Sequence, residues 1–170
     1  MLAWFTMDAE APPGAADRVL ERLARDLGAR GLPVAGAVQR NIDLGPDRPC
    51  DMEMVVLGSD LPPLRISQSL GPGAEGCRLD TGALEMAVAR TAPHLPGAGL
   101  VIIPKFGRQE AAGRGFRDLI GQALGDGQAV VLYVPRQQQA AFLEFAGELA
   151  CRVAPADLPA WCLDRFAAVP

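Results

Sequence analysis

The chain has 170 residues, of which 49% are hydrophobic and 21% are charged, and this composition excludes a disordered or fibrous chain. A formal net charge of -4 leaves no broad cationic surface for a nucleic-acid backbone, and no stretch approaches the roughly 20 apolar residues of a membrane span. We therefore expect a single cytoplasmic domain over residues 1–170, without nucleic-acid or membrane partners.

The first forty residues alternate between strand and helix patterns. Residues 2–6 form a short apolar run before a Pro-Pro-Gly loop, which predicts a buried first strand. Apolar residues then recur at helical spacing over 15–29, and Gly31 is placed to end that helix. Residues 33–38 have the pattern of a second strand.

The pattern changes between residues 39 and 68. Segments 51–57 and 64–67 alternate polar and apolar residues on either side of a turn that contains glycine and two prolines. This arrangement predicts a β-hairpin, inserted over about 40–68 into the alternation of strands and helices.

The second half of the chain returns to alternating elements. Segment 99–104 is the most apolar strand pattern, as expected for the central strand of a parallel sheet that is covered on both faces. The whole order predicts an α/β fold with a doubly wound, mostly parallel sheet. The other predicted elements are helices over 81–92 (with Asp80 or Thr81 as N-cap), 116–124 and 136–148, strands over 129–134 and 149–153, and a C-terminal helix or tail over 156–170.

The loop after 99–104 is a basic island in an acidic chain. Ligands of open parallel sheets bind at the carboxyl ends of the strands, where glycines let backbone N–H groups approach and cations hold an oxyanion. An ordinary solvated loop with Glu110 paired to an arginine is the alternative. The residues that we assign to a ligand site here are Lys105, Gly107, Arg108, Glu110, Arg114 and Arg117.

A glycine-rich segment before residue 80 supplies a second group of candidates. Arg78 can contact an anion, Cys77 can act as a soft ligand or reactive thiol, and Ser67 and Gln68 can donate hydrogen bonds. We add Asp80 to this group; the alternative is a buried filler role for Cys77 and a helix-cap role for Asp80.

Metal and disulfide chemistry receive little support. His94 is the single histidine, which excludes a histidine-rich metal site. The four cysteines are widely spaced and form no C-x-x-C pair, so no disulfide framework is expected. A thiolate or carboxylate site stays open, but we assign no metal ligands, and the sequence leaves the cofactor and the oligomeric state undetermined.

Three motifs stand out in chain order: Arg65-Ile-Ser-Gln-Ser-Leu-Gly71, Gly76-Cys-Arg-Leu-Asp80 and Lys105-Phe-Gly-Arg-Gln-Glu-Ala-Ala-Gly-Arg-Gly-Phe-Arg117. Together they resemble a bacterial family called domain of unknown function 2478, and the likeness covers nearly the whole chain. That family is similar, more distantly, to small P-loop nucleoside-triphosphatases. The resemblance implies a P-loop fold in which 100–110 occupies the Walker B segment and Gly107 and Glu110 match that segment's glycine and glutamate.

Departures from the P-loop pattern bear on activity. A phosphate loop needs G-x-x-x-x-G-K-[ST], because the lysine neutralises the phosphates and the hydroxyl holds magnesium. In the matching stretch only Gly14 remains, and Ala15, Ala16 and Asp17 replace Gly-Lys-Ser. Lys105 stands where a carboxylate that positions magnesium is expected. We therefore do not expect conventional hydrolysis of ATP or GTP.

The preferred function is therefore that of a binding protein for a small anionic ligand, such as molybdate, phosphate or a nucleotide. Molybdate is included because members of the resembled family look linked to molybdenum metabolism. One alternative is an enzyme with altered nucleoside-triphosphatase or transferase chemistry, which uses Glu110 as a base or Cys77 as a nucleophile. Another is a regulatory protein-interaction subunit that keeps the fold without the site.

Overall fold

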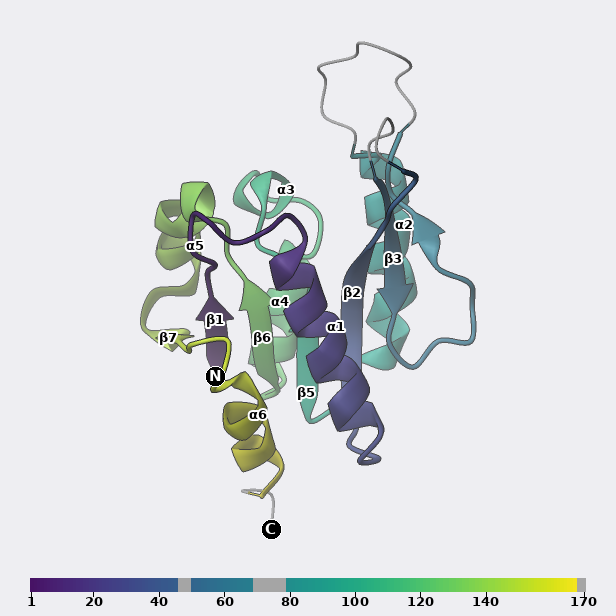
Figure 1. Ribbon diagram of the computed structural model, residues 1–170. Coiled ribbons are helices and arrows are strands. Elements are labelled where there is room, and N and C mark those ends of the chain that lie inside the picture. The colour runs from purple at the N-terminus through teal and green to yellow at the C-terminus, as the bar shows by residue number, and fades with distance from the viewer. Residues whose placement is uncertain (46–49, 69–78, 168–170) are drawn as a thin grey trace.

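A seven-stranded sheet in the order β4-β3-β2-β5-β6-β1-β7 runs through the described part of the chain (Figure 1). The computed structural model describes residues 1–45, 50–68 and 79–167. Its strands are β1 (Leu2–Phe5), β2 (Val34–Ile42), β3 (Asp51–Val56), β4 (Leu64–Arg65), β5 (Leu100–Ile103), β6 (Ala129–Tyr133) and β7 (Ala150–Arg152). Its α-helices are α1 (Ala15–Gly28), α2 (Thr81–Thr91), α3 (Arg108–Ala111), α4 (Arg117–Gly125), α5 (Gln139–Ala146) and α6 (Leu158–Ala167).

The sheet is parallel from β2 to β7 and antiparallel at its other end. β5 pairs in parallel with β2 and β6, and β1 pairs in parallel with β6 and β7. All four residues of β5 are buried, because helices cover both faces of this central strand. The predicted doubly wound, mostly parallel α/β sheet is confirmed.

Strand β2 is longer than the sequence pattern indicated. We expected it to end at residue 38, but it continues to Ile42 and pairs antiparallel with β3, which in turn pairs with β4. The hairpin between β3 and β4 is thus confirmed, and it is joined to the main sheet through the far half of β2. The pattern hid this extension because residues 39–42 are mostly polar and three of them are exposed.

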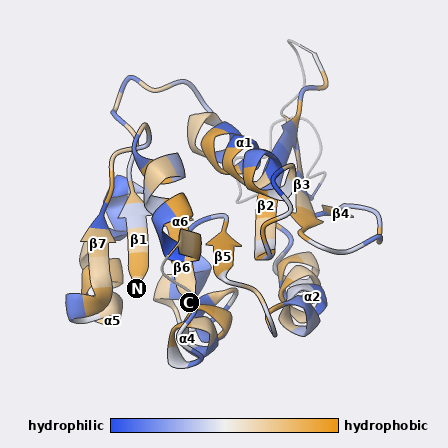
Figure 2. Ribbon diagram, turned by 90° about the horizontal axis from the view of Figure 1, so that it is seen from below, coloured by the Kyte–Doolittle hydropathy of each residue, from blue (hydrophilic) through white to orange (hydrophobic). Residues whose placement is uncertain are grey.

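Two hydrophobic clusters lie on the two faces of the sheet. Figure 2, viewed along the strands, shows α1 on one face and α2 and α4 on the other. One of the clusters contains the apolar stripe of α1, formed by Leu20, Leu23 and Leu27. Trp161 and Phe166 of α6, which are partly buried, pack against the same cluster. This packing keeps both aromatic rings of the C-terminal helix out of full contact with solvent.

Gly36 permits close contact between β2 and β5. Its φ angle is +112°, and a Cβ at this position would overlap the backbone of Ile102. Only glycine fits such an approach. Gly36 is also the last residue of β2 that pairs with β5, so it marks the point where the two strands part.

Short helix α3 was not predicted, because the sequence pattern of 105–117 was that of a loop. Four residues are too few to show a helical period.

Among the described residues, no helix is both long enough and apolar enough to span a membrane.

Candidate functional site

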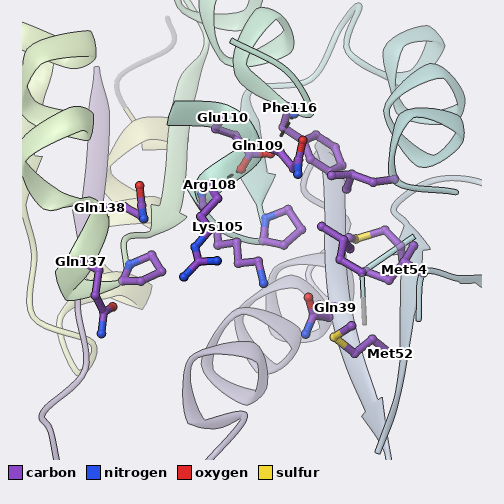
Figure 3. Close-up of a pocket in the computed structure, with 16 residues that line it drawn as sticks. Gln39, Met52, Met54, Lys105, Arg108, Gln109, Glu110, Phe116, Gln137 and Gln138 are labelled. Carbon is purple, nitrogen blue, oxygen red and sulfur yellow. Dashed lines mark hydrogen bonds between the residues drawn. The ribbon is translucent and has the colours of Figure 1, made fainter. Parts of the chain in front are cut away.

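A cavity of about 430 Å³ opens at the carboxyl ends of β5 and β6 (Figure 3). Lys105 and Arg108 reach it from the segment after β5, and Gln137 and Gln138 reach it from the segment after β6. The opposite side is formed by β2, β3, the segment after β4 and α2. The cavity therefore occupies the place where parallel α/β sheets bind ligands.

Divergence of two strands makes room for this cavity. β2 pairs with β5 from Val34 to Gly36 and then turns to β3, with which it pairs from Ala37 to Ile42. Gln39, three residues beyond the last pair with β5, lines the resulting space.

A second cavity, of about 310 Å³, lies beside the loop that joins β1 to α1. That loop, the first turn of α1 and the end of β6 form its walls. Gln39, Lys105 and Gln137 line both cavities. The two spaces thus adjoin at Lys105, and a ligand held by its ammonium group can extend into either.

Lys105 is the only lysine of the chain. Its side chain is partly buried, yet no hydrogen-bond acceptor and no ion-pair partner for it lies among the described residues. The neighbouring Arg108 is exposed and likewise has no partner within the described ranges. Two cations that form no direct ion pair with any described residue thus line one cavity of an acidic chain.

Asp17 lines the second cavity from the first turn of α1. Its carboxylate accepts hydrogen bonds from Asn41 Nδ2 at 2.7 Å and Gln39 Nε2 at 3.3 Å. Burial raises the pKa of Asp17 above its usual value, and the Asn41 hydrogen bond and the Lys105 charge oppose that rise. The Asp17 carboxyl group and the Lys105 ammonium group therefore line the same cavity.

Gln39 is only 6% exposed and holds an incompletely paired amide. Its Nε2 donates to Asp17 and to Asn41 Oδ1, which fixes the orientation of the amide. Its Oε1 is buried and has no hydrogen-bond partner in the described structure. A buried acceptor without a partner is uncommon, and only a hydrogen-bond donor can satisfy it.

Glu110 is 3% exposed and fastens the loop after β5. Its carboxylate accepts hydrogen bonds from the backbone N–H groups of Gly107 at 2.8 Å and Phe116 at 3.1 Å. Burial raises the pKa of Glu110, and these backbone hydrogen bonds partly oppose the rise. Gly107, which lines the cavity, is therefore held in place by Glu110 rather than contributing its N–H group to a ligand.

The predicted basic island divides into two parts. Lys105 and Arg108 line the cavity, whereas Arg114 and Arg117 do not. Arg114 is exposed and donates to Gln109 Oε1 at 2.9 Å. The Arg117 guanidinium lies 4.4 Å from the centre of the Phe145 ring and donates to the backbone carbonyl of Glu110. The alternative was an arginine paired with the Glu110 carboxylate, and no arginine of the described residues makes that pair.

The second predicted group does not reach either cavity in its described members. Ser67 is buried, accepts a hydrogen bond from the Met52 N–H at 3.1 Å and donates to Asp51 Oδ1. Gln68 is exposed, and Asp80 caps α2 by accepting from the Ala83 N–H. The helix-cap role that the sequence offered as the alternative for Asp80 is thus confirmed. Cys77 and Arg78 lie outside the described residues.

Sequence reasoning missed the cavity residues that come from strands. Gln39, Met52 and Met54 were not assigned to a site, although the alternation in Asp51-Met-Glu-Met54 places both methionines on one face of β3. The signal was present in the strand periodicity, but only the pairing of β3 with the extended β2 shows which face borders the cavity.

No three His, Cys, Asp or Glu side chains gather at a metal-binding distance in the ranges that the structure describes. The cavity is lined instead by two cations without an ion-pair partner in the described part of the chain, by amide groups and by an apolar wall.

The fold is P-loop nucleoside-triphosphatase-like. It matches the crystal structure of THEP1 from the hyperthermophile Aquifex aeolicus with a TM-score of 0.63 and 15% identity, over 96% of both chains. A family model described as protein of unknown function, DUF2478, matches residues 7–161, and the chain belongs to that family. The predicted resemblance is confirmed.

A curated relative shares part of this sequence. The chain is 36% identical over 132 residues to molybdenum import ATP-binding protein ModC 2 of Bradyrhizobium diazoefficiens. The match covers 77% of this chain but only 15% of that protein. The shared region is thus a small part of the relative.

Proposed function

We propose that this protein binds a small anionic ligand at Lys105, where the two cavities adjoin, and does not hydrolyse nucleoside triphosphates in the conventional way. One observation carries the proposal: the chain's only lysine follows the central strand, lines both cavities and has no partner among the described residues. A partly desolvated cation without a counterion favours an anionic ligand, because charge-assisted hydrogen bonds are strong in such surroundings.

The loop between β1 and α1 supports the second half of the proposal. It has no lysine, and Asp17 occupies the first turn of the helix where a phosphate loop has its hydroxyl. A carboxylate in this cavity repels a polyphosphate. We therefore regard this loop as a degenerate Walker A motif.

Molybdate is our first candidate for the inorganic ligand. The relative that shares 132 residues with this chain is named for molybdenum import, and molybdate is the oxyanion form of that element in water. Because that relative is also named as an ATP-binding protein, a nucleotide is the second candidate.

Labelling of the single lysine tests the proposal directly. The purified protein is treated with an amine-acylating reagent, with and without molybdate, phosphate or ATP, and peptide mass spectrometry measures acylation of Lys105. A ligand of this site should protect Lys105 and leave acylation of the chain's α-amino group unchanged. Equal acylation of Lys105 with and without every one of these anions would contradict the proposal.

Calorimetric titration with matched variants completes the test. Lys105→Gln should weaken binding of the protecting anion by about tenfold or more, because it removes a charge-assisted contact. Arg114→Gln removes the same charge from an exposed side chain outside the cavity and should leave affinity within about twofold. Both variants should melt within about 2 °C of the parent, since neither side chain is buried in the core.

A nucleotide panel tests the absence of conventional hydrolysis. ATP and GTP are incubated with the protein, with and without magnesium, and phosphate release is measured. Turnover that requires magnesium and survives Lys105→Gln would overturn this half of the proposal.

A further inference from the structure

The larger cavity has more room than an inorganic oxyanion needs. Its volume is about 430 Å³, in the range of sites that enclose organic ligands. A water molecule occupies about 30 Å³ in the liquid, and a tetrahedral oxyanion is only a few times larger. Such an anion at Lys105 therefore leaves most of the cavity unfilled.

The rest of the cavity is lined by apolar side chains from several elements. Met54 is 2% exposed, Ile66 is fully buried and Phe116 is 1% exposed, so their places in the wall are fixed by the core. Met52 and Leu84 complete the wall from β3 and α2. Methionine side chains are flexible and polarisable, and they adapt to the shape of an apolar ligand.

The charged groups and most of the amides lie away from the methionines. Figure 3 shows Met52 and Met54 on the side opposite Gln137 and Gln138, with Lys105 between the two sides. Gln39 is the exception, because it lies beside Met52. The charge of Lys105 is thus offered next to a wall that is mainly apolar.

We infer that the ligand of this cavity is an organic anion, with its anionic group at Lys105 and an apolar body against Met52, Met54, Ile66, Leu84 and Phe116. The inference rests on the proposed anion site at Lys105, adds the chemical class of the ligand and replaces molybdate with an organic anion as the first candidate. An inorganic oxyanion makes only the polar half of these contacts, and a neutral apolar molecule leaves Lys105 without a counterion.

A homologous series of alkyl phosphates tests the inference on the unaltered protein. Inorganic phosphate and butyl, hexyl and octyl phosphate are titrated by calorimetry at one pH and salt concentration. Each buried methylene should raise affinity by about fourfold until the cavity is filled. The corresponding neutral alcohols should bind far more weakly, because they lack the group that pairs with Lys105.

Two methionine variants locate the apolar body. Met52→Gln places an amide in the cavity wall and should lower the affinity for hexyl phosphate by about fivefold while leaving that for inorganic phosphate unchanged. Met86→Gln makes the same change at a residue of α2 that is 51% exposed and lies outside the cavity, and it should change neither affinity. Lys105→Gln should weaken binding of every phosphate in the series.

The outcomes separate this inference from the proposed function. If inorganic phosphate binds through Lys105 but affinity does not rise with chain length, the organic ligand is wrong and the anion site stands. If affinity rises with chain length equally in the Met52→Gln and Met86→Gln variants, the apolar body lies elsewhere and the inference is again overturned. If no phosphate binds and Lys105 is not protected from acylation by any anion, both proposals fail.

Discussion

Lys105 and Asp17 line the same cavity, the lysine from the end of the central strand and the aspartate from the first turn of α1. The Lys105 charge lowers the pKa of Asp17, but burial, which is the larger effect, raises it. The cation is thus accompanied by an internal anion that it does not pair with directly. An incoming anion meets attraction from one residue and repulsion from the other.

Removing the Asp17 charge should strengthen anion binding. Asp17→Asn keeps an acceptor for the Asn41 amide and removes the repulsion, so affinity for inorganic phosphate should rise roughly threefold to tenfold. Calorimetric titration of phosphate at pH 7 measures the change. Glu21→Gln is the matched control, since Glu21 lies on the same helix, pairs with Arg40 and lines neither cavity. An equal gain in both variants would mean that net charge, and not Asp17, sets the affinity.

Stability of the Glu110→Gln variant should depend on pH relative to the parent. Because burial raises the pKa of Glu110 in the folded state, the folded protein binds this proton more tightly than the unfolded chain does. The contribution of Glu110 to the unfolding free energy therefore falls as the pH rises from its usual pKa, 4.5, through the raised value.

Glutamine does not titrate, so its stability deficit relative to the parent should be largest near pH 4.5 and smaller at neutral pH. Urea denaturation of both proteins across this range checks the sign. A deficit that grows towards neutral pH would show that the charged carboxylate is the favoured form in the folded protein.

A pair of glycine variants should reveal how tightly Glu110 is packed. Gly115 has a φ angle of +60°, and a Cβ there would overlap Glu110 Oε1. Gly113 has a φ angle of +79°, and a Cβ there would meet no atom within 4 Å. Both alanine variants carry a strained backbone that costs on the order of 1 kcal/mol. Gly115→Ala should lose about 1–3 kcal/mol beyond the loss of Gly113→Ala, as measured by urea denaturation, because it also displaces a buried carboxylate from its hydrogen bonds. Equal losses would contradict the packing described for Glu110.

Arg117 should contribute to stability and not to ligand binding. Its guanidinium lies over the Phe145 ring and donates to the Glu110 carbonyl, so Arg117→Ala should cost about 1–2 kcal/mol of unfolding free energy. Anion affinity should stay within about twofold of the parent value. Arg114→Ala provides the control for loss of a positive charge near this loop, and it should change the unfolding free energy by less than about 0.5 kcal/mol. A tenfold loss of anion affinity in Arg117→Ala would show that Arg117 takes part in ligand binding after all.

Local patterns predicted the parts of the fold that local chemistry determines. β5 was identified as the central strand because a continuous apolar run is what burial on both faces requires. Helix α1 was found from its apolar stripe, and the cap of α2 from Asp80. The far half of β2 was missed because its polar residues are held in a strand by β3, and such pairing is a tertiary effect.

The site was only half predictable for a similar reason. The loop after β5 was found because its glycines and cations are concentrated in one stretch of sequence. The directions of its side chains could not be predicted, because they depend on distant residues. Arg117, for example, packs on Phe145 of α5. Gln39 and the methionines of β3 reach the cavity only through the pairing of strands. The sequence therefore shows which loop is charged, but it does not show which of the charged side chains point into the same cavity.

The two outermost strands of the sheet are very short: β4 has two residues and β7 has three. An edge strand attracts other chains through its row of unpaired backbone N–H and C=O groups, and the described edges leave few such groups available. Assembly by sheet extension, in which one copy adds its strands to those of another, is accordingly disfavoured. Any self-association of this protein is expected to use side-chain surfaces of its helices and loops instead.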